Sequence, residues 1–295
     1  MYRLLSSQVI INNVVTLTFP YIENSFNLDQ NALKKAYRKY LKHIQPHCPY
    51  PDNNQLFYSD ITTELNFTDY FSDEEFDVKE IERKINVNEV LYKDAEDRKK
   101  VLENALSYLE KTDPMFSELF CLIMNTVFCT ATKKLGGTSV NPRFIGVMCA
   151  YHDMTAEEQA VPELLIHEFT HNVLFLDELR YGHYHYEKLY DPNLYLDAVD
   201  RGVKFKFPLN RCLHSLIVSA EILLARNAYI GHAPKVTQHL TSSKILERSK
   251  NYVQIIRQNK DFNQIMTDRS RELFAICEKF YGEYQLNEMG NDILL

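Results

Sequence analysis

The chain has 295 residues, of which 45% are hydrophobic and 25% are charged, the proportions of an ordinary globular protein. Asp and Glu outnumber Lys and Arg by 40 to 33, giving a net charge of −7, so no strong basic field is available for a nucleic-acid backbone. Glycine occurs only 8 times, well under the average usage of roughly 7%. Glycine-loop nucleotide folds and turn-dense β folds are therefore disfavoured, and a helix-rich protein is expected.

The cysteines and the N-terminus indicate the compartment. No CxxC pair occurs, and most of the six cysteines lie in apolar runs, which is typical of buried, reduced thiols and not of a disulfide framework. The stretch up to Phe19 is interrupted by Ser and Asn and lacks the apolar core of a signal peptide. No apolar run approaches the ~18 residues of a membrane span. We expect a cytoplasmic protein without a membrane partner.

Hydrophobic spacing predicts the elements of the first half. Residues 1–20 alternate enough apolar and β-branched positions to predict one or two strands, and 24–45 has helical spacing that ends before a proline. The proline-containing stretch 47–60 indicates a loop. The acidic residues of 69–82 are typical of a solvated surface, and helical periodicity resumes over 87–109.

The second half is predicted to alternate helix and strand before a helical end. Helical spacing covers 114–135 and 155–179. Between them lie a glycine-containing loop at 136–142 and an apolar run at 144–151 with the composition of a buried strand. After an aromatic, irregular stretch, the spacing predicts three further helices, over 209–230, 241–258 and 262–284.

These elements predict a mainly α fold with a small β-sheet. A helix with an HExxH motif would pack beside the short sheet, and a C-terminal helical bundle would follow. Composition suggests three segments: an N-terminal strand and helix segment (1–50), an acidic helical segment (51–112) and a metal-site helical domain (113–295). One continuous domain that includes all three is the alternative.

The strongest chemical signal is His167-Glu168-Phe169-Thr170-His171, inside the predicted helix 155–179. Histidines four residues apart stand one turn apart on the same helix face, so both imidazoles can reach one metal ion while Glu168 projects beside them. A chance occurrence of the motif is the alternative. Imidazole ligands suit zinc, iron(II) and copper alike, so the motif leaves the metal open.

Several residues are candidates for a third ligand. His214 and Glu221 share one face of the predicted helix, two turns apart, so one can bind the metal while the other supports it. Glu221 resembles the downstream helical glutamate of gluzincin peptidases. Asp177 stands where a metzincin has its third histidine, but without the glycine turn we expect it to be solvated. His183 and His185 are expected on the surface or in contact with substrate.

A group of segments between residues 115 and 230 resembles the HExxH-motif proteins encoded beside ribosomally made peptide natural products. They are Gly136-Gly137-Thr138-Ser139, Gly146-Val147, Pro162–His171 with Leu174 and Leu176-Asp177, Pro208-Leu209 and Leu213-His214. That family is understood to include iron(II)- and 2-oxoglutarate-dependent peptide β-hydroxylases. The resemblance implies a peptide substrate and Fe(II) held by His167, His171 and His214.

The resemblance also bears on the cosubstrate. The family has an arginine-rich segment with an Arg-Pro pair before the Leu-His, and here Phe207-Pro208 stands in that place. Arg201 and Arg211 are therefore our candidates for binding the distal carboxylate of 2-oxoglutarate, since arginine can bind a carboxylate through two hydrogen bonds. The tyrosines of 181–195 suit either a peptide groove or the core of an irregular loop.

Two enzyme classes follow from the motif. In a hydroxylase, Glu168 would be a supporting carboxylate. In a zinc peptidase, His167, His171 and either Glu221 or His214 would hold Zn²⁺, and Glu168 would be the general base. A purely structural metal is the weakest reading, because structural zinc usually has four protein ligands and often cysteines. The sequence leaves the oligomeric state open.

Overall fold

A computed structural model describes residues 4–23, 29–51, 53, 55–60, 62–64, 66–67, 89–130, 140, 142–152, 159–200, 203–232, 239–286 and 292–293. They form two compact units. One lies within Ser6–Leu176, and the other lies within Asp177–Leu295 and includes Leu4 and Leu5. The division falls inside the helix that carries the HExxH motif, away from the boundaries near 50 and 112 expected from composition.

The chain begins with a helix where strands were predicted. Helix α1 covers Ser7–Thr18, and the side chain of Ser6 caps it by accepting a hydrogen bond from the Val9 N–H. Its buried residues, Ile10, Asn13, Val14 and Thr18, follow helical spacing. The prediction of strands was wrong because Ile10, Val14 and Thr18 pack on one helix face, and this packing overrides the strand preference of β-branched residues. A 3-10 turn, η1, follows at Phe19–Tyr21.

Helix α2 covers Gln30–Ile44, as helical spacing predicted. Asp29 caps it by accepting from the Ala32 N–H at 2.7 Å. One face is buried against α1 and α6 through Leu33, Ala36, Tyr37, Tyr40 and Leu41. The other face is basic and lines a cavity together with Asn125 and Thr126.

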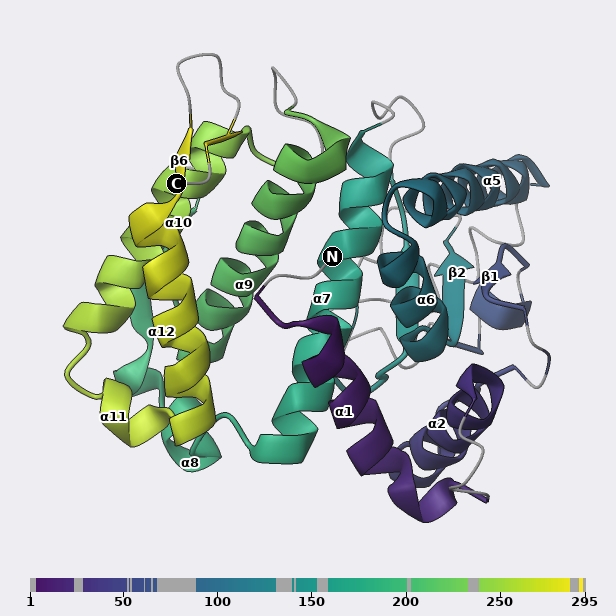
Figure 1. The fold of residues 1–295 in the computed structure, drawn as a ribbon, viewed down its shortest axis with the longest axis horizontal. Helices are drawn as coiled ribbons and strands as arrows, with labels where there is room; N and C mark the ends of the chain where they lie inside the picture. Colours follow the sequence, from purple (N-terminus) through teal and green to yellow (C-terminus); the bar gives the residue numbers. More distant parts are fainter. Residues whose placement is uncertain are drawn as a thin grey trace. The chain divides into compact units, whose positions relative to one another are not determined.

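A three-stranded parallel sheet forms the centre of the first unit (Figure 1). Its order is β1 (Phe57–Tyr58), β2 (Thr126–Cys129) and β3 (Val147–Ala150), and every residue in it is buried. Helix α5 (Glu89–Thr112) packs on β1, β2 and α6. Buried strands flanked by helices are the usual environment of parallel pairing.

Helix α6 is shorter than predicted. It covers Pro114–Ile123, where a helix over 114–135 was expected. The chain turns extended at Met124, and the N–H groups of Asn125 and Thr126 both donate to the Gly146 carbonyl, which starts β2. A short apolar run cannot be assigned to helix or strand by periodicity alone, and this run divides between the two.

Helix α7 covers Ala160–Tyr181 and carries the HExxH motif. It lies beside the sheet, as predicted: Asn172 Oδ1 accepts from the Gly146 N–H, one residue before β3, at 2.7 Å. Phe169 packs edge-on against Phe116 of α6, with ring centroids 5.3 Å apart. The motif is therefore fixed on the first unit by one hydrogen bond to the sheet and by aromatic packing on α6.

The second unit contains the C-terminal helices. Helices α9 (Leu209–Ala225), α10 (Ser242–Gln258) and α12 (Asp268–Glu283) pack on one another, which confirms the predicted bundle. A π-helical turn at Arg226–Ile230 extends α9. The short elements are α8 (Tyr186–Leu189), η3 (Pro192–Leu194), α11 (Phe262–Ile265) and two antiparallel pairs, β4 (Leu196–Asp200) with β5 (Val203–Phe207) and β6 (Gln285–Leu286) with β7 (Asp292–Ile293).

The predicted fold class, mainly α with a small sheet, is confirmed. The hairpin of β4 and β5 was not predicted, although Val203–Phe207 alternates apolar and charged residues as a half-exposed strand does. All six cysteines are free, and Cys121 is the exposed one. In the part of the chain that the structure describes, no helix has the length and apolar content to cross a bilayer.

Candidate metal centre

His167 and His171 present their ring nitrogens to each other. Both lie on α7, and their Nε2 atoms are 3.3 Å apart. The rings meet at 61°, with centroids 5.0 Å apart. The prediction that the helix places both imidazoles on one face is confirmed.

This separation fits two ligands of one metal ion. Two Zn–N bonds of about 2.0–2.1 Å at a tetrahedral centre put their nitrogens about 3.3–3.4 Å apart. The same distance also fits a hydrogen bond between two neutral imidazoles, in which one Nε2–H donates to the other Nε2. Among the described residues, no set of three or more His, Cys, Asp or Glu is arranged to hold a metal ion. The pair therefore supplies two ligands, and a complete site needs more.

Glu168 is buried beside this pair. Its side chain is 5% exposed, and its Oε1 lies 3.9 Å from His167 Nε2. Burial raises the pKa of Glu168 to about 8 and lowers the pKa of His171 to about 4. Both shifts favour neutral forms, and neutral imidazole is the form that binds metals.

The backbone around the motif is held by side chains of the same helix. Thr170 Oγ1 donates to the Ile166 carbonyl at 2.7 Å, and Asn172 Nδ2 donates to the Glu168 carbonyl at 3.0 Å. Since Asn172 Oδ1 also binds Gly146, a single amide links the motif to the sheet. Gly146 has φ +83°, and a Cβ there would meet Asn125 Nδ2 at 2.9 Å and the Ile123 carbonyl at 3.0 Å. Only glycine fits that position without strain.

The candidates for the third ligand lie in the second unit. His214 and Glu221 are both buried on α9, 8% and 3% exposed. Glu221 Oε1 accepts from the Leu4 N–H at 3.3 Å, a contact that suits a structural role. Because His167 and His171 belong to the first unit, the assignment of either residue as third ligand stays a prediction.

The two arginines proposed for the cosubstrate remain predictions as well. Arg211 is exposed in the first turn of α9, where an arginine can be solvated and needs no binding partner. Arg201 lies outside the described residues.

Asp177 and His183 correct two expectations. Both are completely buried, so the predictions of a solvated Asp177 and a surface His183 were wrong. Asp177 Oδ2 lies 2.8 Å from His183 Nε2, and Arg269 binds both carboxylate oxygens at 2.9 Å. Arg269 neutralises the carboxylate from 92 residues away, which sequence spacing does not reveal. His185 is exposed, as expected.

The tyrosines of this region divide between surface and core. Tyr181, Tyr186 and Tyr190 are 45%, 46% and 56% exposed, whereas Tyr184 is 4% exposed. Arg269 lies over the Tyr181 ring, 4.9 Å from its centroid. Tyr184 thus fills the core of the unit, the three exposed tyrosines are available to solvent, and the remaining Tyr195 is half-buried.

Comparison with known proteins gives no relative for this site. No family model matches the chain, and no curated protein matches it. The assignment of function therefore depends on the histidine pair and on the motif.

Proposed function

We propose that the protein is a metal-dependent enzyme that modifies peptides, with iron(II)- and 2-oxoglutarate-dependent β-hydroxylation as its reaction. The observation that carries the proposal is the convergence of the His167 and His171 Nε2 atoms, 3.3 Å apart, on a buried helix. The resemblance of residues 115–230 to the peptide-modifying HExxH proteins supports the choice of reaction. Peptide substrate, iron and cosubstrate all follow from that resemblance.

The chain's residues have separate tasks in this proposal. His167 and His171 bind the metal, with His214 as the third ligand that the resemblance implies. Iron(II) with 2-oxoglutarate and oxygen supplies the oxidant that hydroxylates an unactivated carbon, with succinate and carbon dioxide as coproducts. Glu168 orients the first histidine, and Arg211 or Arg201 binds the distal carboxylate of the cosubstrate.

A zinc peptidase is the second candidate, and the position of Glu168 favours it. Its Oε1 is 3.9 Å from His167 Nε2, beside the histidine pair. Zn²⁺ held by the two histidines and a third ligand would supply an activated water molecule. Glu168 would accept a proton from that water and return it to the leaving amine. Glu221 or His214 would be the third ligand.

The deciding experiment is reconstitution under two conditions. In one, the protein is loaded anaerobically with Fe(II), then given 2-oxoglutarate, oxygen and peptides encoded next to its gene. We expect succinate together with a peptide product heavier by roughly 16 Da, the mass of one oxygen atom. In the other, the protein is loaded with Zn²⁺ and given the same peptides without cosubstrate. Cleavage there would establish the peptidase and refute the hydroxylase.

The substitution Glu168→Gln separates the two reactions while nearly preserving shape. A peptidase should retain its metal and lose about 10²–10⁴-fold in rate, because its general base is gone. A hydroxylase should lose much less. Glu187→Gln, on the exposed surface of α8, is the matched control and should leave either activity unchanged.

Metal content identifies the third ligand. His214→Ala should abolish metal retention, whereas Glu221→Ala should cost about 10- to 100-fold in affinity if Glu221 only supports a ligand. His185→Ala removes an exposed histidine and should have no effect. If Glu221→Ala abolishes metal retention and His214→Ala only weakens it, Glu221 is the third ligand, as in gluzincin peptidases.

A further inference from the structure

A serine at the start of α10 contacts a histidine and an arginine. Ser242 is the first residue of this helix and is 5% exposed. Its Oγ lies 2.6 Å from His232 Nδ1, and Arg226 Nη1 donates to the same Oγ at 3.0 Å. All three residues belong to the second unit, and none of them is part of the HExxH motif.

These contacts assign the direction of the serine hydroxyl. A guanidinium only donates hydrogen bonds, so Ser242 Oγ accepts from Arg226. Of the two described side chains bonded to Oγ, His232 is the one that can accept its proton, as a neutral imidazole protonated on Nε2. A hydroxyl that donates to an imidazole nitrogen at 2.6 Å is the arrangement of a nucleophile beside its general base.

Arg226 is placed to stabilise negative charge on the serine oxygen. It lies in the π-helical turn that extends α9, it is 1% exposed, and its Nη1 also donates to the Leu240 carbonyl at 3.0 Å. A guanidinium keeps its charge when buried. Its hydrogen bond to Ser242 Oγ therefore becomes stronger as the oxygen loses its proton.

The first turn of α10 provides a second source of positive charge. Thr241 is extended, with φ −57° and ψ 154°, and its side chain makes no capping hydrogen bond among the described residues. Ser242 therefore stands at a turn into a helix, beside N–H groups that lack helical partners. Hydrolases that place a nucleophilic serine at such a turn use the next N–H to bind the oxyanion. The Ser243 N–H has that position here.

Gly231 fixes the histidine beside this cluster. Its N–H donates to the Arg226 carbonyl at 2.8 Å and closes the π-helical turn, and its φ of +83° lies in the left-handed region that favours glycine. His232 follows directly, so the same turn holds the arginine and the histidine. His232 is half-buried, whereas the arginine and the serine are buried. The histidine is thus the part of the cluster that a small molecule can reach.

From the Ser242–His232 hydrogen bond, the buried Arg226 cation and the start of α10, we propose that Ser242 is a nucleophile that accepts an acyl group from an activated ester. Its Oγ attacks the ester carbonyl carbon while its proton passes to His232 Nδ1. The bond to the alcohol or phenol part breaks, and that part leaves with the proton. Water then hydrolyses the acyl-serine, with His232 again as base, which releases the carboxylic acid and restores the hydroxyl.

This reaction has no redox step and requires no metal ion. The proposal therefore stands or falls separately from the proposed metal-dependent activity. If the three residues only joined α9 to α10, Ser242 would react no faster than any other serine of the chain.

The test is covalent labelling of the full chain with a fluorophosphonate, in a buffer whose chelator removes metal ions. An activated serine displaces fluoride from this probe and keeps a stable phosphonate ester. We expect one label per chain, and peptide mapping by mass spectrometry should place it on Ser242. No label, or a label only on other residues, would overturn the proposal.

Substitutions test the role of each group. Ser242→Ala should lose the label, and Ser243→Ala, an exposed serine next to it, should keep it. His232→Gln should slow labelling by about 10²–10⁴-fold, because the general base is lost. His185→Gln changes an exposed histidine and should label at the unmodified rate. An unchanged rate in His232→Gln would overturn the assignment of the base. Mapping the unmodified chain locates the label even if Ser242→Ala does not fold.

The acyl-transfer step itself is measured with p-nitrophenyl acetate as the probe. Release of p-nitrophenol should fall in Ser242→Ala and persist in Ser243→Ala, with an acetyl group trapped on Ser242 of the unmodified chain after rapid acid quenching. Equal release from both variants would mean that other groups attack the ester, and it would overturn this step.

Discussion

Two histidine groups lie on α7 or directly after it, the half-buried pair His167 and His171 and the completely buried His183, and they differ in the contacts of their ring nitrogens. In the first unit, His167 and His171 turn Nε2 atoms towards each other, with one carboxylate at 3.9 Å. In the second unit, His183 lies 2.8 Å from Asp177, and Arg269 binds both oxygens of that carboxylate.

The difference separates a binding arrangement from a structural one. The Asp177 carboxylate is paired with His183 and Arg269, and this pairing raises the pKa of Arg269, although His183 Nδ1 has no hydrogen-bond partner among the described residues. Around His171 and Glu168, burial is the cause of the pKa shifts. The first group is suited to receive an ion and the second to hold its unit together. Four substitutions or titrations test this comparison.

Asp177→Asn should have the largest effect. It removes the negative partner of Arg269 in a buried network, and breaking a buried ion pair typically costs about 3–5 kcal/mol of unfolding free energy. Urea unfolding measures the loss. Asp97→Asn breaks the exposed ion pair with Lys100 and should change stability by less than about 0.5 kcal/mol. Similar results for both variants would mean that the Asp177 network is not structural.

Metal binding should stabilise the first group and leave the second unaffected. Zinc at about 100 times its Kd should raise the free energy of unfolding by about 2.7 kcal/mol. His171→Ala should remove this gain, and the exposed His185→Ala should keep it. If the gain survives in His171→Ala, the metal binds elsewhere.

Asn172→Ala tests how the motif is fixed to the sheet. It deprives the Gly146 N–H of its acceptor in a buried place, which should cost about 1–3 kcal/mol. The exposed Asn193→Ala, which loses only the side-chain hydrogen bond from Asn193 Nδ2 to Asp191, serves as control in the same unfolding measurement. Because Asn172 also positions the Glu168 carbonyl, the substitution should weaken metal binding too. Unchanged stability would contradict this role.

Ser270→Ala should have the smallest effect. The Ser270 hydroxyl donates to the His183 carbonyl, but that carbonyl also accepts from the Thr267 N–H at 3.0 Å and from its hydroxyl at 3.1 Å. The loss should be near the low end of a single hydrogen bond, about 0.5–1.5 kcal/mol. A loss as large as that of Asp177→Asn would show that the serine has a larger part in the network.

Sequence periodicity predicted those elements whose pattern is local. Helices α2 and α10 have an apolar stripe at helical spacing, whereas α7 and α9 are apolar and buried on most sides, and the ends of all four lie within about six residues of the expected ones. Helix α1 and strand β2 were missed because their residue types also suit the other structure. Contacts with distant residues decided both cases. Helix α1 packs on α2 and α6, and β2 begins where the N–H groups of Asn125 and Thr126 donate to the Gly146 carbonyl.

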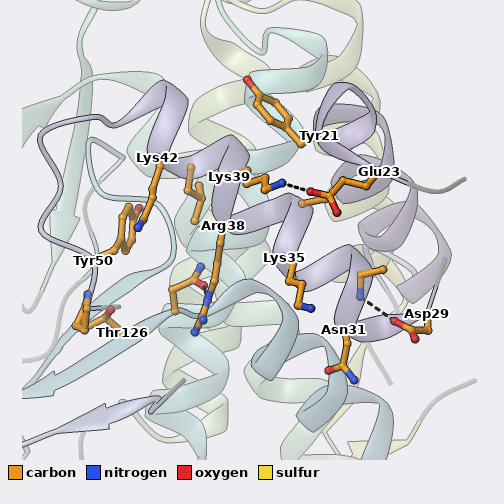
Figure 2. A pocket seen from close by; sticks show the side chains of 15 residues that line it. Tyr21, Glu23, Asp29, Asn31, Lys35, Arg38, Lys39, Lys42, Tyr50 and Thr126 are labelled. Carbon is orange, nitrogen blue, oxygen red and sulfur yellow. Dashed lines mark hydrogen bonds and ion pairs between the residues drawn. The ribbon is translucent and has the colours of Figure 1, made fainter. Parts of the chain in front are cut away.

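The candidate metal centre was likewise predictable only where its geometry is set by neighbouring residues. Helix geometry alone placed His167 beside His171. It did not reveal Arg269 beside Asp177, since these residues are 92 positions apart. The spacing of lysine and arginine along α2 predicts the basic face that lines the cavity (Figure 2). The cavity could not be predicted, because Asn125 and Thr126, from another part of the chain, complete its wall.

Gly146 offers a criterion for recognising distant relatives. Its N–H binds Asn172 next to the histidine motif, its carbonyl accepts from Asn125 next to the basic cavity, and its positive φ excludes other side chains. Sequences that share this fold should therefore keep a glycine just before the strand and an asparagine directly after the second histidine. An HExxH sequence without that pair would have to attach its helix to the sheet by other contacts, whatever its overall similarity.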